Sequence, residues 1–205
     1  MILVGQLDSP FVRRVAVTMQ LYGMAYERRV LSVFADAAAV RELNPLGKVP
    51  ALIGDDGVAL YDSTFILDWL DQQAGPARAL TPPSGPARRD VQRLVAVALG
   101  VAEKSVERNG ETVRRPPDKQ VPEAIARIDQ QIAGSLAWLE GEAAGDWLHG
   151  NAMTQADVTL TAALGHLGNR HPALLPADAY PRLMAVAARC EALPAFQAAP
   201  FEAGG

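Results

Sequence analysis

The chain has 205 residues, of which 49% are hydrophobic and 20% charged, and its formal net charge is −4. This composition is typical of a globular protein with a sizeable core, and it excludes extensive disorder. Because no excess of basic residues is present, we expect neither nucleic acid nor an anionic membrane surface as a partner.

The first residues, Met1–Gly5, are apolar but have no basic stretch before them, and polar residues from Asp8 on interrupt the run. They predict a first strand and not a signal peptide. No apolar run approaches the length of a membrane span. Cys190 is the only cysteine, so an internal disulfide is excluded, and we expect a cytoplasmic protein.

The same cysteine lies in an Ala-rich helical pattern, which predicts a buried thiol without a catalytic role. The three histidines, His149, His166 and His171, have no metal-ligand spacing. We therefore expect no metal.

The N-terminal part alternates strand and helix signals. Ile2–Val4 predicts a strand, and a helix with apolar residues at helical spacing follows between Ser9 and Gly23, which have the properties of its two caps. A second strand is expected at Tyr26–Leu31, and an Ala-rich segment precedes Asn44. This order predicts a β-α-β-α half.

A hairpin is the next expected element. Val49–Ile53 and Val58–Tyr61 are apolar runs, and the Gly-Asp-Asp-Gly sequence between them has turn chemistry. A helix is predicted at Ser63–Ala74, ended by Gly75. The proline-rich residues 76–86 that follow are the best candidate for a linker.

Beyond the proline-rich stretch, strand signals disappear and long helical patterns predict an all-helical second domain. These patterns cover residues 88–107, 122–139, 154–167 and 180–193. The predicted organisation is a first domain at 1–75, a linker at 76–86 and a helical domain at 87–205.

Ser9 is the first candidate for chemistry, because it lies where a strand leads into a helix. A hydroxyl at this place is next to the free N–H groups and the positive end of the helix, which favour an anion. The alternative is that Ser9 only caps the helix.

The segment Asn44-Pro-Leu-Gly-Lys-Val-Pro50 is the second candidate. Pro50 cannot donate to a sheet, so it indicates the end of a strand. A cis peptide bond after Val49 would leave the backbone of Val49 free for an extended peptide ligand. The alternative is an ordinary edge-strand proline.

Two further pairs begin predicted helices. At Asp62-Ser63, the N–H and hydroxyl of Ser63 at a helix start suit a carboxylate, with ordinary capping as the alternative. Thr154 and Asp157 have the spacing of a capping box, and we interpret them as structural.

These four features, in this order and with the proline-rich stretch before the fourth, resemble the cytosolic glutathione transferase family over nearly the whole chain. The small bacterial members that begin with Ser-Pro-Phe-Val-Arg are most similar. The resemblance implies an α/β thioredoxin-like domain with the order β-α-β-α-β-β-α and an all-α C-terminal domain. It also implies a cis Val49–Pro50 bond, a core helix nucleated by Thr154 and Asp157, and a homodimer.

The resemblance also implies roles for residues of the first domain. Ser9 would donate a hydrogen bond to the sulfur of glutathione, which acts as a co-substrate. The backbone of Val49, before Pro50, would pair with the cysteinyl unit, and Asp62 and Ser63 would hold the γ-glutamyl end. Lys48 would face the glycyl carboxylate, or it is a solvated surface lysine.

Two arginines follow the first motif. Arg13 and Arg14 would add positive potential near the sulfur, or one of them is an exposed helix residue or part of an interdomain ion pair.

A pocket for a small hydrophobic electrophile is expected between the Ser9 loop and the helical domain. Its predicted lining is Phe11, Val101, Lys104, Ser105, Arg108 and His166. Three alternatives stay open: a transferase, a glutathione-dependent isomerase, dehalogenase or peroxidase, and a non-catalytic binding or regulatory protein on the same fold.

Overall fold

The computed structural model describes residues 1–176 and 178–202, which form two compact units. The sheet unit consists of Met1–Pro83 and a second stretch that begins at Ala192, and the helical unit consists of Ser84–Glu191. Among the described residues, no helix is both long enough and apolar enough to pass through a lipid bilayer.

The sheet unit contains four short strands in the order β2-β1-β3-β4. Their bounds are β1 Ile2–Val4, β2 Glu27–Arg29, β3 Ala51–Ile53 and β4 Ala59–Tyr61. β1 is parallel to β2 and antiparallel to β3, and β4 is antiparallel to β3. The two antiparallel strands β3 and β4 form the hairpin predicted from the Gly-Asp-Asp-Gly turn.

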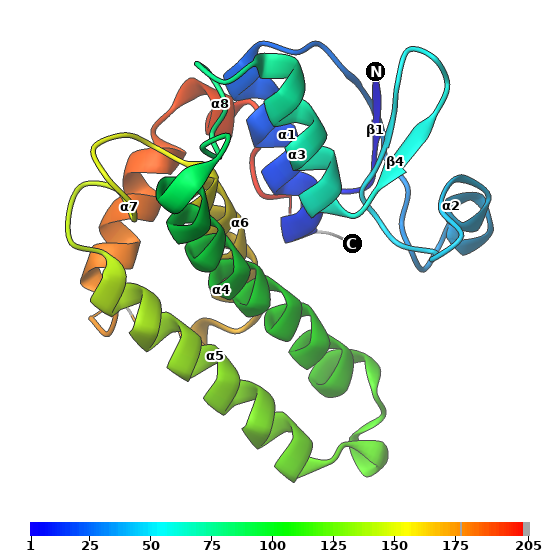
Figure 1. Cartoon of the computed structure of the whole chain (residues 1–205). Coiled ribbons are helices and arrows are strands. Elements are labelled where there is room, and N and C mark those ends of the chain that lie inside the picture. The colour runs from blue at the N-terminus through cyan, green and yellow to red at the C-terminus, as the bar shows by residue number, and fades with distance from the viewer. Residues whose placement is uncertain (177, 203–205) are drawn as a thin grey trace. The chain divides into compact units, whose positions relative to one another are not determined.

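Three helices complete the order β-α-β-α-β-β-α: α1 Pro10–Tyr22, α2 Ala37–Leu43 and α3 Ser63–Ala74. α1 and α3 lie side by side, whereas α2 lies on the far side of the strands from them (Figure 1). Their apolar faces and the strands bury residues such as Val15, Leu52 and Ile66 completely. The predicted thioredoxin-like architecture is confirmed.

The caps of α1 explain its length. Ser9 is the N-cap, Pro10 occupies the first turn, and Gly23 ends the helix with φ 66°, a left-handed conformation that glycine adopts without steric cost. The N–H of Gly23 donates to backbone carbonyls of the last turn, those of Gln20 and Met19. The predicted start and end of this helix are confirmed.

Most of the predicted linker belongs to the sheet unit, which extends to Pro83. The buried carboxylate of Asp71 on α3 accepts hydrogen bonds from the Tyr22 hydroxyl, from the Leu80 N–H at 3.2 Å and from the Thr81 N–H at 3.3 Å. Because buried polar groups are paired with hydrogen-bond partners, these bonds fix Leu80 and Thr81 of the predicted linker to α3.

The end of the predicted linker is helical, because α4 begins at Gly85 and not at residue 88. Pro86 is compatible with this start, since a residue in the first turn of a helix has no intrahelical partner for its N–H. The proline-rich composition therefore marked the boundary between the two units, but the connection between them is shorter than the predicted linker.

The C-terminal segment corrects the predicted domain 87–205, because the stretch from Ala192 groups with the sheet unit. It contains α8 (Pro194–Gln197), whose Phe196 is buried, and the carbonyl of Ala199 accepts a hydrogen bond from Arg13 Nε at 2.9 Å. Residues 203–205 of the predicted domain lie outside the described residues.

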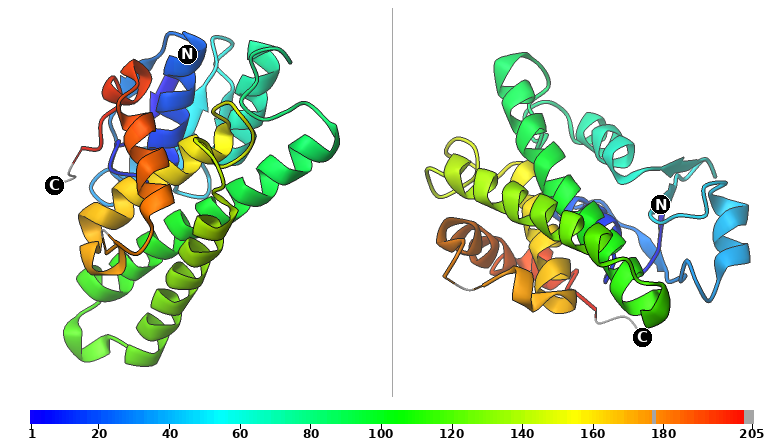
Figure 2. Two further views of the ribbon diagram at one scale, coloured as in Figure 1. Left: turned by 90° about the vertical axis from the view of Figure 1, so that its left-hand side faces the viewer. Right: turned by 90° about the horizontal axis from the view of Figure 1, so that it is seen from below.

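The helical unit consists of four α-helices and three short turns of other helix types among its described residues. The α-helices are α4 Gly85–Asn109, α5 Pro122–Glu142, α6 Gln155–Arg170 and α7 Pro181–Glu191. Figure 2 shows α4 and α5 running side by side, and α6 packs against α4 as well. Their contact faces bury Ala98, Leu136 and Leu160. The predicted all-helical composition of this unit is confirmed.

The predicted capping box starts α6. Asp157 Oδ2 accepts from the Thr154 N–H at 2.7 Å, and Thr154 Oγ1 accepts from the Ala156 N–H at 3.2 Å. Asp157 Oδ1 also accepts from the N–H of Leu148 at 2.8 Å, so one buried carboxylate ties the preceding loop to the helix. The structural role of this pair is confirmed.

Candidate functional site

The three candidate segments of the first domain leave the sheet at one end. Val4, the last residue of β1, lies opposite Ala51, the first residue of β3, and Ala51 lies opposite Tyr61, the last residue of β4. The loop to Ser9, the proline turn before β3 and the start of α3 therefore begin from one row of the sheet. The motifs are separate in the sequence, and the strand register brings them together.

Gly5 shows how closely two of these segments approach. A Cβ atom at Gly5 would lie 2.6 Å from Val12 Cγ2 and 3.0 Å from Val49 Cβ, and the φ of Gly5 is +127°. Only a glycine fits between these side chains in this conformation. The start of α1 and the turn before β3 are therefore packed against each other through a residue without a side chain.

Ser9 is half-buried at the N-cap of α1, where its Oγ accepts a hydrogen bond from the Val12 N–H at 3.4 Å. A hydroxyl has one donor in addition to its acceptor lone pairs. Within residues 1–176 and 178–202, the Ser9 hydroxyl donates to no atom. The Ser9 hydroxyl is therefore available to donate a hydrogen bond to a ligand next to the positive end of a helix.

The peptide bond between Val49 and Pro50 is cis, as the resemblance implies. The turn before it is held by Asn44, whose Nδ2 donates to the Lys48 carbonyl at 2.8 Å and whose Oδ1 accepts from the Leu46 N–H at 3.0 Å. The backbone N–H and carbonyl of Val49 are bonded to none of the described residues. An extended ligand strand has a donor and an acceptor to pair with here.

Lys48, next to this bond, has an exposed side chain. Its ammonium group forms no ion pair with the part of the chain that the structure describes. The predicted contact with a glycyl carboxylate stays a prediction.

Asp62 and Ser63 form the start of α3. Asp62 has a φ of 65°, the only positive φ of a non-glycine residue among those described, and its Oδ1 accepts from the Thr64 N–H at 2.8 Å. Such a conformation costs about 1–3 kcal/mol and is commonest at functional sites. The N–H and hydroxyl of Ser63, which is 5% exposed, have no hydrogen-bond partner among the described residues.

Neither arginine of α1 is exposed, so the alternative of a surface helix residue is wrong. Arg13 is 2% exposed and Arg14 is 1% exposed. The Arg13 guanidinium lies 5.9 Å from the centre of the Phe196 ring, and Arg14 Nη2 donates to Thr64 Oγ1 at 3.1 Å. Both groups place buried positive charge within two turns of Ser9.

Three of the residues predicted to line the electrophile pocket are buried, namely Val101, Ser105 and His166. Ser105 Oγ lies 2.7 Å from His166 Nδ1. Burial, with smaller effects of Arg170 and His171, lowers the pKa of His166 to about 4, so the imidazole is neutral at pH 7. Their role in substrate binding stays a prediction.

Arg108 belongs to a network of polar side chains that no sequence motif indicates. Its Nε and Nη2 donate to the two carboxylate oxygens of Asp129 at 2.5 and 3.3 Å, and its Nη1 lies 3.0 Å from His171 Nδ1. Because a guanidinium only donates, His171 Nδ1 is an acceptor, and its Nε2–H donates to the Ser105 carbonyl at 3.1 Å. No motif joins residues so far apart along the chain.

The other two residues predicted for the electrophile pocket lie on different units. Phe11 is half-buried on α1, two residues after Ser9. Lys104, paired with Glu107 at 2.5 Å, lines a pocket of about 540 Å³ between α4 and α5, together with Trp138 of α5.

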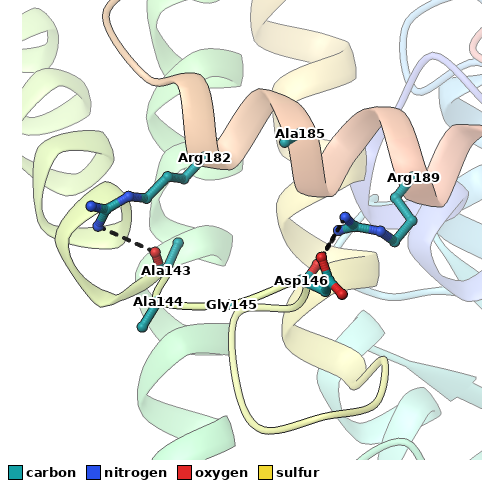
Figure 3. A pocket seen from close by; sticks show the side chains of 7 residues that line it. All are labelled: Ala143, Ala144, Gly145, Asp146, Arg182, Ala185 and Arg189. Carbon is teal, nitrogen blue, oxygen red and sulfur yellow. Dashed lines mark hydrogen bonds and ion pairs between the residues drawn. The ribbon is translucent and has the colours of Figure 1, made fainter.

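A second pocket of the helical unit, of about 630 Å³, lies between α7 and the loop after α5 (Figure 3). Arg182 Nη1 donates to the Ala143 carbonyl at 3.3 Å, and Arg189 pairs with Asp146 at 2.8 Å. Both guanidinium groups are thus bonded to oxygen atoms of the protein, and we assign no ligand to this pocket. Ser9, Val49 and Ser63 line neither pocket.

The sole cysteine lies on α7 and is fully buried, as predicted. Burial raises the pKa of the Cys190 thiol to about 11, so thiolate chemistry there is suppressed at neutral pH. The described residues contain no group of three or more His, Cys, Asp or Glu side chains arranged to hold a metal ion.

Comparisons with known proteins agree with this fold. The family model for the glutathione S-transferase N-terminal domain matches residues 3–79, and the model for the glutathione S-transferase C-terminal domain matches residues 122–189. A maleylacetoacetate isomerase of Pseudomonas aeruginosa is 30% identical over 203 residues, covering 91% of this chain and 89% of the relative.

Solved structures extend the likeness. A glutathione transferase family member from Pseudomonas fluorescens with bound glutathione is 34% identical, with a TM-score of 0.86 and coverage of 97% of both chains. A glutathione S-transferase of Methylobacterium radiotolerans in complex with glutathione sulfonate is 27% identical, with a TM-score of 0.92 and coverage of 99% of this chain and 96% of that chain.

The fold and the row of three segments define a thioredoxin-like domain joined to a helical domain. The chain belongs to the glutathione S-transferase family.

Proposed function

We propose that this protein is a glutathione transferase in which Ser9 stabilises the thiolate of bound glutathione for attack on a small hydrophobic electrophile. One observation carries the proposal: the Ser9 hydroxyl has an unused donor at the N-terminus of α1, in the loop that leaves the same end of the sheet as Val49 and Ser63. Glutathione bound to one similar structure and glutathione sulfonate bound to another support the ligand.

The required change in the thiol is small. A free thiol has a pKa of about 8.5, so roughly a few per cent is ionised at neutral pH. A pKa lower by one unit corresponds to about 1.4 kcal/mol, which one charge-assisted hydrogen bond and a helix N-terminus together provide. The thiol proton leaves to water, because no described His, Lys or carboxylate is hydrogen bonded to Ser9 as a base.

The rest of the tripeptide is assigned to the other two segments. The free N–H and carbonyl of Val49 pair with the cysteinyl unit in the manner of a short antiparallel strand. The N–H and hydroxyl of Ser63 at the start of α3 bind the γ-glutamyl carboxylate, and the exposed Asp62 carboxylate binds the ammonium group. Lys48 binds the glycyl carboxylate.

For the electrophile, Phe11 is the first candidate. It follows Ser9 by two residues, and its aromatic ring is only half-buried, so it offers an apolar surface next to the reacting sulfur. Lys104 and Arg108 are second candidates on α4, and each already has a carboxylate partner.

The relative of P. aeruginosa favours a second candidate function. Its name specifies isomerisation of maleylacetoacetate, and its alignment covers most of both chains. An isomerase adds the glutathione sulfur to a substrate double bond and later releases it, so it uses the same thiolate as a transferase. A dehalogenase or a peroxidase would also use the glutathione thiolate, whereas a non-catalytic binding protein would only bind glutathione.

We also propose a cytoplasmic homodimer. Phe65, on the exposed side of α3 one turn before Trp69, is 71% exposed, and large exposed aromatic side chains are enriched where proteins associate. Light scattering at several protein concentrations tests this: a mass of twice 21.8 kDa supports the dimer, and a mass of 21.8 kDa contradicts it.

Calorimetry tests the ligand. Glutathione should bind with a micromolar to millimolar dissociation constant, and Ser63→Ala should weaken binding about tenfold, because one hydrogen bond to a charged group contributes about 1.5–3 kcal/mol. Ser84→Ala is the matched control, since Ser84 lies at the start of α4, as the residue before its first turn, and makes no capping hydrogen bond. A folded protein that binds no glutathione would contradict the proposal.

A substrate panel then separates the enzyme classes. An aryl halide, a cis-configured unsaturated diketo acid and an organic hydroperoxide, each with glutathione, report transfer, isomerisation and reduction. Glutathione binding without turnover of any of them would favour the non-catalytic alternative.

A further inference from the structure

The C-terminal strap, which we define as residues 196–202, packs within the sheet unit near the start of α1. Phe196 is 1% exposed and Ala199 is 0% exposed. These values are those of core residues, although the segment is only a short helix followed by an irregular chain. The strap therefore contributes buried residues to the core of the sheet unit.

Its first contact is with the helix that carries Ser9. Arg13 Nε donates to the Ala199 carbonyl at 2.9 Å, and the Arg13 backbone N–H donates to the Ser9 carbonyl at 2.9 Å. A buried guanidinium needs its acceptors, because desolvation without them is costly. The first turn of α1 and the strap are thus joined through one residue.

Its second contact is with β2. This strand pairs with β1, and β1 leads into the Ser9 loop, which we define as residues 5–9. Glu202 accepts two hydrogen bonds from Arg28 of β2, each of 2.8 Å. The pKa of the Glu202 carboxyl is lowered, mainly by this hydrogen bond and less by the Coulomb attraction of Arg28. Glu202 therefore ties the strap to β2, and the Arg29 carbonyl of the same strand accepts the Gly5 N–H of the Ser9 loop at 2.9 Å.

Backbone hydrogen bonds hold the two ends of the Ser9 loop. The Gly5 N–H donates to the Arg29 carbonyl at 2.9 Å, and the Ser9 N–H donates to the Gln6 carbonyl at 3.2 Å within the loop itself. Leu7, between them, is 1% exposed and reaches no further backbone acceptor among the described residues. The strap therefore holds the elements on either side of this loop, α1 through Arg13 and β2 through Arg28.

We propose that the C-terminal strap positions Ser9: Ala199 and Glu202 fix α1 and the Ser9 loop so that the serine hydroxyl points at the glutathione sulfur. This inference rests on the proposed function, and it adds Glu202, Arg28 and Arg13 as positioning residues. A hydrogen bond weakens steeply when its angle falls, so a small displacement of the loop weakens thiolate stabilisation without unfolding the protein.

Three variants test the proposal in the full-length chain. Glu202→Gln keeps the size of the side chain but removes its charge. The double variant Arg28→Glu with Glu202→Arg keeps an ion pair between the two positions but exchanges the positions of the two charges. Glu111→Gln is the matched control, because Glu111 also forms a two-pronged, solvent-accessible pair, with Arg115 at 2.6 and 2.7 Å, in the helical unit. The partly exposed Arg28–Glu202 pair contributes little to global stability, so these variants should fold.

Two readouts decide the outcome. In the ligand-free protein, hydrogen exchange of the Leu7 and Ser9 amides should be about tenfold faster in Glu202→Gln than in the wild type. In the glutathione complex, the thiol pKa should rise by about half a unit, which lowers thiolate-limited kcat about threefold at low pH with little change in KM. The exchanged pair should recover most of the thiol pKa and of kcat, and Glu111→Gln should change neither readout.

Unchanged amide exchange in Glu202→Gln would overturn the proposal, and so would faster exchange with an unchanged thiol pKa. A wild-type protein that binds no glutathione would instead refute the proposed function, and amide exchange alone would then show whether the strap holds the loop.

Discussion

Arg14 Nη2 donates a hydrogen bond of 3.1 Å to Thr64 Oγ1, so a buried guanidinium joins the helix that begins after Ser9 to the helix that begins with Ser63. These two helix starts are the proposed binding places of the glutathione sulfur and of the γ-glutamyl carboxylate. Their spacing depends on this contact between α1 and α3, in addition to the sheet below them.

Thr64→Val tests this contact, because valine keeps the branched shape and removes the acceptor. We expect a loss of about 1–2 kcal/mol in the free energy of unfolding, since the acceptor of a buried charged donor is lost, and about threefold weaker glutathione binding. Urea denaturation and calorimetry measure the two effects. Thr112→Val is the control, because Thr112 also makes one hydrogen bond, to the Arg108 carbonyl at 2.8 Å, but in the helical unit. Equal losses of affinity in both variants would contradict the expectation.

Gly5→Ala should destabilise the sheet unit strongly. The new Cβ would lie 2.6 Å from Val12 and 3.0 Å from Val49 at a φ of +127°, so both steric overlap and backbone strain oppose it. We expect a loss of about 3 kcal/mol or more in denaturant unfolding. Gly23→Ala is the control for strain alone, because nothing lies within 4 Å of its Cβ position, and it should cost about 1 kcal/mol. Equal effects would show that the packing at Gly5 is looser than described.

The local signals were sufficient for most of the fold. Turn residues at 54–57 and cap residues such as Ser9 and Gly23 act within a few positions of themselves, so their effects are visible in the sequence. The cis geometry of Val49–Pro50 came from the family resemblance and not from base rates for proline, which favour trans.

The long-range contacts were not visible in the sequence. The strap returns to Arg13 across 186 positions, and Arg108 meets Asp129 and His171 on two other elements. A helical pattern reports one apolar face, and it does not tell which distant carbonyl or carboxylate satisfies a buried cation. For the same reason, the roles of Val101 and Ser105 could not be judged before their burial was known.

Stability should fall on acidification because of His166. Its pKa is lowered from 6.5 to about 4 in the folded state, so between these values the unfolded chain binds a proton that the folded protein does not. The contribution is fully present above pH 6.5 and is lost as the pH falls toward 4. We expect about 2 kcal/mol less stability at pH 5 than at pH 7 from this group, measured by urea unfolding.

His166→Asn is the control variant, because its amide can keep a hydrogen bond to Ser105 but does not titrate. The difference in stability between pH 7 and pH 5 should shrink by about 2 kcal/mol in this variant. An unchanged pH dependence would contradict the buried, neutral state of His166.

Cys190 should be inert to thiol reagents in the native protein. It is fully buried and burial raises its pKa to about 11, so the thiolate fraction at pH 8 is very small. With an aromatic disulfide reagent, we expect no reaction in buffer within the time in which free glutathione reacts completely, and one thiol per chain in strong denaturant. Rapid labelling of the native protein would show that this thiol is accessible.

The central claim is that the Ser9 hydroxyl stabilises the glutathione thiolate. Ser9→Ala removes the donor and also a helix cap, and Thr154→Ala, which removes the cap of α6, is the control for the loss of stability of about 1 kcal/mol. The direct measurement is the pKa of bound glutathione, followed by the ultraviolet absorbance of the thiolate. We predict a pKa at least one unit below that of free glutathione in the wild type and in Thr154→Ala, and a value close to that of free glutathione in Ser9→Ala. A thiol pKa that is the same in Ser9→Ala and in the wild type would contradict the account.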